Sequence, residues 1–232
     1  MDRLALFKES LPSLISGLAI TLKITLFSLI IAIILGLIFG LMNISKKKSI
    51  KSIAVVYIDL IRGTPLLVQA FFIYFGLPMV SGVRIDPMVA GVVALSLNAG
   101  AYMAEIFRGG IQGVDNGQME AARSLGLSYS TAMVKVVIPQ AIRKMIPAII
   151  NQFIISLKDT SILSVIGIRE LTQSGQIIIA RTYQAFDLWL MVGVMYLVVI
   201  TLLSILSKNL ERSLSYDQSK RTAKAFWKLK SA

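Results

Sequence analysis

The sequence predicts an all-α polytopic membrane protein with five membrane-spanning helices. Of its 232 residues, 56% are hydrophobic and only 16% are charged, a composition typical of membrane proteins. Five apolar stretches are long enough to cross a hydrocarbon layer, which takes about 20 helical residues. Cysteine and histidine are absent, which excludes disulfides, thiolate or imidazole metal ligands and a Ser-His-Asp triad.

The predicted spans follow one another with short polar connections. Residues 1–10 form a polar external segment without the apolar core of a removable signal peptide, and residues 11–206 form one transmembrane domain. Its spans are expected at residues 11–42, 53–77, 87–107, 138–157 and 188–206. Pro139 is expected to open the fourth span. Residues 157–186 are too polar for a crossing and are interpreted as short helices or a re-entrant turn.

Small residues recur every three or four positions along one face of the first span. They are Gly17, Thr21, Thr25, Ser28, Ala32, Gly36 and Gly40. The last two form a Gly-x-x-x-Gly pattern, which lets two membrane helices approach closely. We therefore expect this face to pack against another membrane helix.

The charges predict which side of the membrane each connection faces. Sixteen of the 24 lysines and arginines fall in the turn 46–51, the loop 107–144 and the tail from residue 207. Only six fall in the other connections. By the positive-inside rule, the N-terminus is outside and the C-terminus is cytoplasmic. The net charge of +12 therefore requires no nucleic-acid partner. The basic tail 207–232 is expected to contact lipid headgroups, the alternative being a solvated, partly disordered tail.

Polar groups inside the second span form the first of three candidate binding sets. An ionised side chain at the bilayer centre costs about 2.5 to 3.5 kcal/mol, so each one needs a partner or a wet cavity. Asp59 and Arg62 are three residues apart and could neutralise each other. Alternatively, Gly63, Thr64 and Pro65 loosen the helix, and Arg62 lines a cavity where it could bind a carboxylate bidentately.

The other two sets lie in the third and fourth spans. Asn98, Tyr102 and Glu105 share one helix face, which could line a cavity or form an interhelical hydrogen-bond seam. Gln152, Ser156 and Asp159 also share a face, and Thr160 and Ser161 follow them directly. Polar side chains and unwound backbone at mid-depth are typical of ligand sites in transporters.

A polar loop, residues 108–137, separates the third and fourth spans. Within it, residues 118–127 predict a helix of about two turns, because Ala121 and Ala122 favour helix and Gly126 suits a left-handed end. A short helix with small side chains and a negative charge at Glu120 is suited to docking on another protein. The alternative is a solvated loop helix.

These motifs together resemble those of ABC importer permeases. Glu120-Ala121-Ala122, Gly126 and Ile138-Pro139 are similar to the cytoplasmic EAA loop of that family. Three further runs look like its polar amino-acid branch: Arg62-Gly63-Thr64-Pro65-Leu66-Leu67-Val68-Gln69, Leu97-Asn98-Ala99-Gly100-Ala101-Tyr102 with Glu105 and Arg108, and Lys158-Asp159-Thr160-Ser161. The resemblance extends over about residues 21–207.

The resemblance implies a type I ABC importer permease fold in a bacterial inner membrane, and a set of partners. ABC ATPase subunits would bind at the cytoplasmic face, and a second permease subunit, identical or closely related, would pair across the small-residue faces. An external solute-binding protein would deliver an amino-acid ligand. ATP and Mg would be bound by the ATPase, since this chain lacks a phosphate-binding loop. The expected ATPase-coupling residues are Gln118, Glu120, Ala121, Ala122, Arg123, Leu125 and Gly126.

The charges in the candidate sets favour a zwitterionic ligand. Arg62 could bind its carboxylate, and Asp159, with Asp59 or Glu105, its ammonium group. The spare acid would suit a basic amino acid, and glutamine or another polar amino acid is the alternative. A polytopic membrane enzyme is a further alternative, although Ser156 and Lys158 lie on different faces of a helix. A passive channel is the last, and it would not need a docking helix.

Overall fold

A computed structural model describes the backbone of residues 3–230 and the side chains of residues 3–209. The described chain is helical, with no strand among its elements. The α-helices are α1 (Arg3–Asn43), α2 (Lys48–Arg62), α3 (Leu66–Phe71), α4 (Leu77–Ser81), α5 (Pro87–Gln112), α6 (Asn116–Ser124), α7 (Tyr129–Ala132), α8 (Ile138–Asp159), α9 (Leu171–Thr182) and α10 (Ala185–Lys230). Two π-helical turns, Phe72–Gly76 and Met133–Val137, and a 3₁₀ helix, Thr160–Ile166, lie between them.

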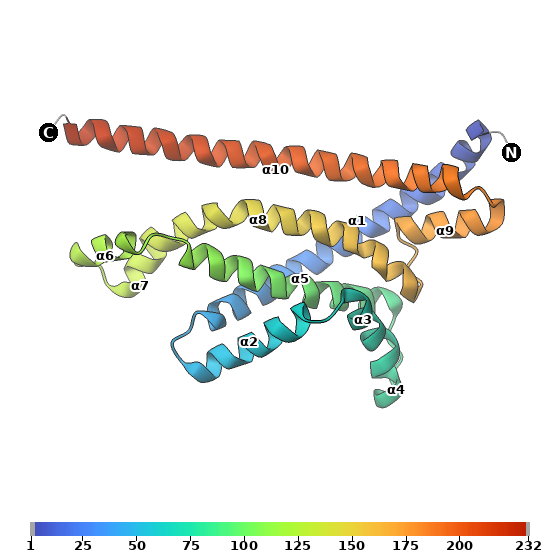
Figure 1. Cartoon of the computed structure of the whole chain (residues 1–232), viewed down its shortest axis with the longest axis horizontal. Coiled ribbons are helices and arrows are strands. Elements are labelled where there is room, and N and C mark those ends of the chain that lie inside the picture. Colours follow the sequence, from blue (N-terminus) through green and yellow to red (C-terminus); the bar gives the residue numbers. More distant parts are fainter. Residues whose placement is uncertain (1–2, 231–232) are drawn as a thin grey trace.

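The long helices run roughly along one axis, and α2, α3 and α4 lie to one side of them (Figure 1). The start of α1 and α9 lie at one end, whereas α6, α7 and the end of α10 lie at the other. The turn between α1 and α2 lies near α6, because Ile44 lines one pocket with Asp115 and Met119. The basic turn, the polar loop and the end of α10 therefore face the same side.

Four helical segments are long and apolar enough to cross a membrane: Arg3–Asn43, Pro87–Gln112, Tyr129–Ile166 and Ala185–Asn209. A fifth span is formed if Lys48–Arg62 and Leu66–Ser81, which are bent by 100° at their junction, count as one. Five predicted apolar stretches thus correspond to five helical segments in order.

The helices extend beyond several of the predicted spans. The first begins at Arg3, so the polar segment before residue 11 is already helical, and α5 continues to Gln112, five residues past the predicted end of the third span. As expected, α8 begins at Ile138 with Pro139 in its first turn. It continues a helical stretch that starts at Tyr129, capped by the Ser128 side chain. The π turn Met133–Val137 ends just before Pro139, and this wider turn relieves the clash that a proline ring makes inside a regular α-helix.

The small-residue face of α1 packs within this chain. Gly36 lies directly against Met103 of α5, and a Cβ on Gly40 would lie 2.9 Å from the Ala104 carbonyl oxygen. At the other end of α1, Gly17 lies against Ser174 of α9. The predicted close helix packing is confirmed, but its expected use for pairing with a second subunit was wrong, because α5 and α9 already cover this face.

The segment between α8 and α10 consists of short helices, as one of the two predicted alternatives stated. The 3₁₀ helix Thr160–Ile166 ends at Gly167, whose φ of +83° lies in the left-handed region that glycine adopts without strain. The backbone of the basic tail continues as the helix α10 to Lys230. The predicted lipid contacts of this tail involve side chains that lie outside the described residues.

Glu170 is fully buried at the start of α9 and joins three helices. Its Oε1 accepts a hydrogen bond from the Gln173 amide at 2.7 Å, which caps α9. Its Oε2 accepts one from the Tyr196 hydroxyl of α10 at 2.9 Å and one from the Thr21 hydroxyl of α1 at 3.4 Å. Burial raises the pKa of the Glu170 carboxyl, and these hydrogen bonds only partly oppose that effect.

We expect Glu170 to make stability depend on pH. A carboxyl whose pKa is higher in the folded state favours folding most below its unfolded pKa, and this contribution is lost as pH rises through the folded value. The wild type should therefore lose thermal stability as pH rises above the ordinary value of 4.5. Glu170→Gln cannot ionise, so its melting temperature should decline less over the same range. If the melting temperatures of both proteins decline equally as pH rises, this expectation is contradicted.

Candidate functional site

The second span is broken at Gly63, Thr64 and Pro65, and this break opens the candidate site. Pro65 has no amide hydrogen and an extended ψ of 141°, so α3 starts afresh in a new direction. The break interrupts the helical hydrogen-bond pattern at the end of α2. Gln69 binds carbonyls there: its Nε2 donates to the carbonyl oxygens of Ile61 at 2.7 Å and Thr64 at 3.0 Å. The Ile61 carbonyl also accepts from the Thr64 hydroxyl at 3.4 Å.

Gln69 also links the break to α5. Its side chain is buried, and its Oε1 accepts a hydrogen bond from Asn98 Nδ2 at 3.1 Å. The Gln69 side chain thus donates to carbonyls at the helix break and accepts from Asn98 of α5. Gln69 was part of the motif recognised in the sequence but was not among the predicted site residues. An amide side chain one helical turn after a Gly-Thr-Pro break, within an apolar stretch, is the signal that could have identified it.

Replacing Gln69 with glutamate should destabilise the protein. The acidic side chain keeps an acceptor for Asn98 but loses both N–H donors, so the short hydrogen bonds to the Ile61 and Thr64 carbonyls are lost, at a cost of about 1 to 3 kcal/mol. We expect a lower melting temperature of the detergent-purified complex. Gln176→Glu is a matched control because Gln176 is exposed on α9, and it should leave the melting temperature nearly unchanged.

The break forms one wall of a cavity of about 500 Å³. Seven of the twelve predicted binding residues line it, together with three residues that were not predicted to bind ligand, Pro65, Leu66 and Ile155. The predicted lining residues are Arg62, Gly63, Thr64, Asn98, Tyr102, Gln152 and Asp159. The second, third and fourth spans therefore contribute to one space, although these residues are distant in the sequence.

The other five predicted residues lie outside the lining. Asp59 is exposed on α2, and Glu105 lies behind Arg62. Ser156 is fully buried and accepts a hydrogen bond from Gln152 at 3.4 Å. Thr160 and Ser161 donate to the carbonyls of Leu157 and Lys158, each at 2.7 Å. Thr160 and Ser161 thus close the end of α8, and their role as ligand contacts stays a prediction.

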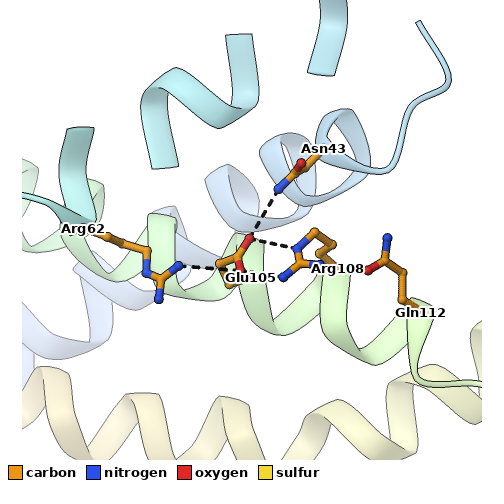
Figure 2. A network of polar contacts seen from close by, with 5 residues as sticks. All are labelled: Asn43, Arg62, Glu105, Arg108 and Gln112. Atoms are coloured by element: carbon orange, nitrogen blue, oxygen red, sulfur yellow. Dashed lines mark hydrogen bonds and ion pairs between the residues drawn. The ribbon is translucent and has the colours of Figure 1, made fainter. Parts of the chain in front are cut away.

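Arg62 pairs with Glu105 and not with Asp59, so of the two alternatives for Arg62 the neutralisation within α2 was wrong. The Arg62 Nη1 lies 3.6 Å from Glu105 Oε2 (Figure 2), and its guanidinium carbon lies 5.4 Å from the Tyr102 ring centre. The side chain turns toward α5 because the helix break brings the end of α2 against that helix. An aromatic face at this distance attracts a cation.

Glu105 has a second and closer cationic partner. Arg108 donates to both of its oxygens, from Nε at 2.9 Å and from Nη2 at 2.7 Å, and Asn43 Nδ2 donates at 3.3 Å (Figure 2). Arg108 also donates to Gln112 Oε1 at 2.8 Å in the last turn of α5. The polar groups of α1, α2 and α5 therefore form one network next to the cavity.

The cavity presents charges of both signs to its interior. Arg62 supplies a guanidinium, and Asp159 supplies a carboxyl from α8. Asn98, Tyr102 and Gln152 add an uncharged hydrogen-bonding wall, while Leu66 and Ile155 add apolar surface. A small molecule with both an anionic and a cationic group fits this combination.

The loop between α5 and α8 presents a separate exposed surface. Asp115 caps α6 by accepting a hydrogen bond from the Gly117 amide at 2.7 Å. The helix ends in a left-handed turn at Gly126, with φ of +84°, and the Leu127 amide donates to the Ala122 carbonyl at 3.2 Å. The predicted short helix and its glycine end are confirmed.

The predicted coupling residues all lie on this loop, and all but one of them are exposed. Ala122 is buried against the rest of the loop, whereas Leu125 is 84% exposed, which is unusual for a leucine. The others are exposed: Gln118, Glu120, Ala121, Arg123 and Gly126. Their role in coupling stays a prediction, and the geometry provides a rigid surface of small, apolar and charged groups.

A family profile matches most of the chain. The family described as "Binding-protein-dependent transport system inner membrane component" matches residues 32–216. The match includes the cavity, the network around Glu105 and the loop with α6.

Proteins of known role are similar over most of their length. The glutamine transport system permease protein GlnP of Escherichia coli (strain K12) is 48% identical over 161 residues, 69% of this chain and 74% of that protein. The arginine transport system permease protein ArtQ of Bacillus subtilis (strain 168) is 41% identical over 204 residues, 88% of this chain and 93% of that protein.

Solved structures share the fold. One described as "Crystal structure of an amino acid ABC transporter with histidines" has a TM-score of 0.88 and 46% identity, covering 92% of this chain and 99% of that chain. The MetNI methionine ABC transporter in an inward-facing conformation has a TM-score of 0.71 at 18% identity, covering 87% of this chain and 95% of that chain, and shows the fold alone. With the helix break, the cavity and the exposed loop helix, these matches identify the chain as a multi-pass inner-membrane permease of the binding-protein-dependent transport family.

Proposed function

We propose that this permease subunit moves an amino acid across the bacterial inner membrane and that the ligand passes through the cavity beside Arg62. The sequence favours a basic amino acid, with glutamine as the alternative. Among the described residues Asp159 is the one acid that lines the cavity, because Asp59 and Glu105 lie outside it, so the lining suits both ligands. The observation that supports this most directly is that Arg62 and Asp159 line the same cavity of about 500 Å³. The similar permeases described for arginine and glutamine transport support the same class of ligand.

Each part of an amino acid has a counterpart in the cavity. The Arg62 guanidinium can hold a carboxylate through two parallel hydrogen bonds. Asp159 can accept from an ammonium or guanidinium group, and Asn98 and Gln152 supply amides for an uncharged side chain. The broken helix makes this possible, because irregular backbone is tolerated at membrane depth where it lines a cavity.

The remaining partners follow from the surfaces of the chain. ABC ATPase subunits, which bind ATP and Mg, dock on the exposed face of α6 at the cytoplasmic side. The basic turn after α1 and the end of α10 share that side, which agrees with an external N-terminus and a cytoplasmic C-terminus. An external binding protein delivers the ligand at the opposite end. A second permease subunit uses surfaces other than the small-residue face of α1.

Ligand-dependent ATPase stimulation tests this function. The permease with its ATPase and binding protein would be reconstituted in vesicles, and hydrolysis would be measured with each of the twenty amino acids. We expect stimulation by arginine, lysine, histidine or glutamine and not by apolar amino acids. Transport without a bound ATPase, or no stimulation by any amino acid, would contradict the proposal.

Asp159→Asn should separate the two ligand classes. Removing one charge that faces a cationic side chain should weaken a basic ligand by about tenfold, since hydrogen bonds to charged groups contribute about 1.5 to 3 kcal/mol. Glutamine has no side-chain charge and should lose less. The measurement is the ligand concentration that gives half-maximal ATPase stimulation. Equal losses for arginine and glutamine would contradict the expectation that Asp159 faces the ligand side chain.

A further inference from the structure

The contact between Arg62 and Glu105 is longer than the contacts that Glu105 makes with Arg108 and Asn43. The two side chains are 3.6 Å apart at their nearest charged atoms, and 42% of Arg62 and 25% of Glu105 side-chain area is exposed. Within the part of the chain whose side chains are described, the Arg62 guanidinium donates no hydrogen bond as short as 3.5 Å. It is therefore a cation at the cavity wall whose donors are largely unused.

Glu105 would stay neutralised if Arg62 moved away. Arg108 binds both of its oxygens at 2.9 and 2.7 Å, and Asn43 donates to one of them at 3.3 Å. Removing one partner from a buried ion pair is costly when it leaves the other charge alone. Here the carboxylate keeps three hydrogen bonds, so the release of Arg62 leaves no unpaired anion.

The geometry points to Glu105 as an internal competitor of the ligand carboxylate. We propose that Glu105 holds Arg62 in the empty cavity and that the arriving carboxylate takes Arg62 over, so that the strength of the Arg62–Glu105 contact sets the affinity for carboxylate-bearing ligands. Glu105 is thus a positioning residue that does not line the cavity. The inference rests on the proposed passage of an amino acid beside Arg62.

Arg108 affects the same competition because it binds Glu105 as well. Its two hydrogen bonds draw the Glu105 carboxylate toward the end of α5 and away from Arg62 (Figure 2). If Arg108 is removed, Arg62 becomes the remaining cation beside Glu105 among these network residues, and it should be held more firmly. Substitutions at Glu105 and Arg108 therefore have opposite expected effects on one binding constant.

Ligand binding to the purified permease–ATPase complex, without binding protein, tests this. The probes are radiolabelled L-arginine and L-argininamide, which differ in the carboxylate, and L-glutamine with L-glutaminamide. In Glu105→Gln, the acid should bind about 2- to 5-fold more tightly, since a partly exposed ion pair is worth up to about that factor. Arg108→Gln should weaken acid binding by a similar factor. The carboxamides should bind equally to all three proteins.

Two results would overturn the inference. If Glu105→Gln changes acid and carboxamide binding by the same factor, or changes neither, Glu105 does not compete for Arg62. An Arg62→Gln variant then shows which proposal has failed. If it removes the preference for acid over carboxamide, Arg62 still binds the ligand carboxylate, and only the competition is wrong. If the wild-type complex shows no such preference, the passage beside Arg62 is itself wrong, and the inference fails with it.

Discussion

Glu120→Lys should abolish most ligand-stimulated ATP hydrolysis, by at least about tenfold. Glu120 is exposed on α6 at the centre of the predicted coupling surface. If it pairs with a basic or backbone donor group on the ATPase, a lysine there would create a repulsion worth several kcal/mol, and each 1.4 kcal/mol is a factor of ten. The measurement is stimulated hydrolysis by reconstituted complex, together with the amount of ATPase that co-purifies.

A lysine placed outside the predicted coupling surface is the control. Ser52 is exposed on α2 and is not a predicted coupling residue. Ser52→Lys should therefore keep most of the activity. Full activity of Glu120→Lys with the complex intact would show that force does not enter the permease through this surface.

Gly36→Leu should prevent the first and third spans from packing. A Cβ on Gly36 would lie directly on the Met103 Cβ and 3.0 Å from the Met103 carbonyl carbon of α5. The backbone of a neighbouring helix cannot move aside as a flexible side chain can, so overpacking should cost about 3 kcal/mol or more. We expect little folded protein in the membrane fraction and a lower melting temperature for any that is purified.

Gly193→Leu is its control, since it adds the same side chain to a membrane helix. A Cβ at Gly193 meets nothing within 4 Å among the described residues. This variant should accumulate to wild-type levels. If Gly36→Leu and Gly193→Leu accumulate equally, the contact between α1 and α5 is not the close packing described here.

The sequence could predict the helices because their signals are local. Long apolar runs predict spans, the Gly-Thr-Pro triplet predicts a break in the second, and Gly126 predicts the end of α6. The direction of the break is not local. It sends Arg62 toward Glu105 of α5, a residue 43 positions away, whereas spacing within one helix could offer only Asp59 as an ionic partner.

The sequence could predict which residues gather at the site, but not which of them line the cavity and which pack behind the lining. Helical periodicity places Gln152, Ser156 and Asp159 on one face, yet only the first and last line the cavity, because Ser156 packs beneath Gln152. Glu170 looked like an ordinary polar residue in an ambiguous segment. Its importance comes from Thr21 and Tyr196, which the fold brings to it from 149 and 26 residues away.

The π turn at Met133–Val137 lies between the loop that holds α6 and the helix that holds Gln152 and Asp159. One residue advances an α-helix by about 100°, and a π turn accommodates one residue more than an α-turn does. The π turn therefore takes up its extra residue without rotating the helix beyond it, and the polar stripe of α8 keeps its direction relative to α6. A one-residue deletion in the regular helix between this turn and Gln152 would instead swing that stripe by more than a quarter of a revolution, so chain length there is as much a determinant of the cavity lining as side-chain identity.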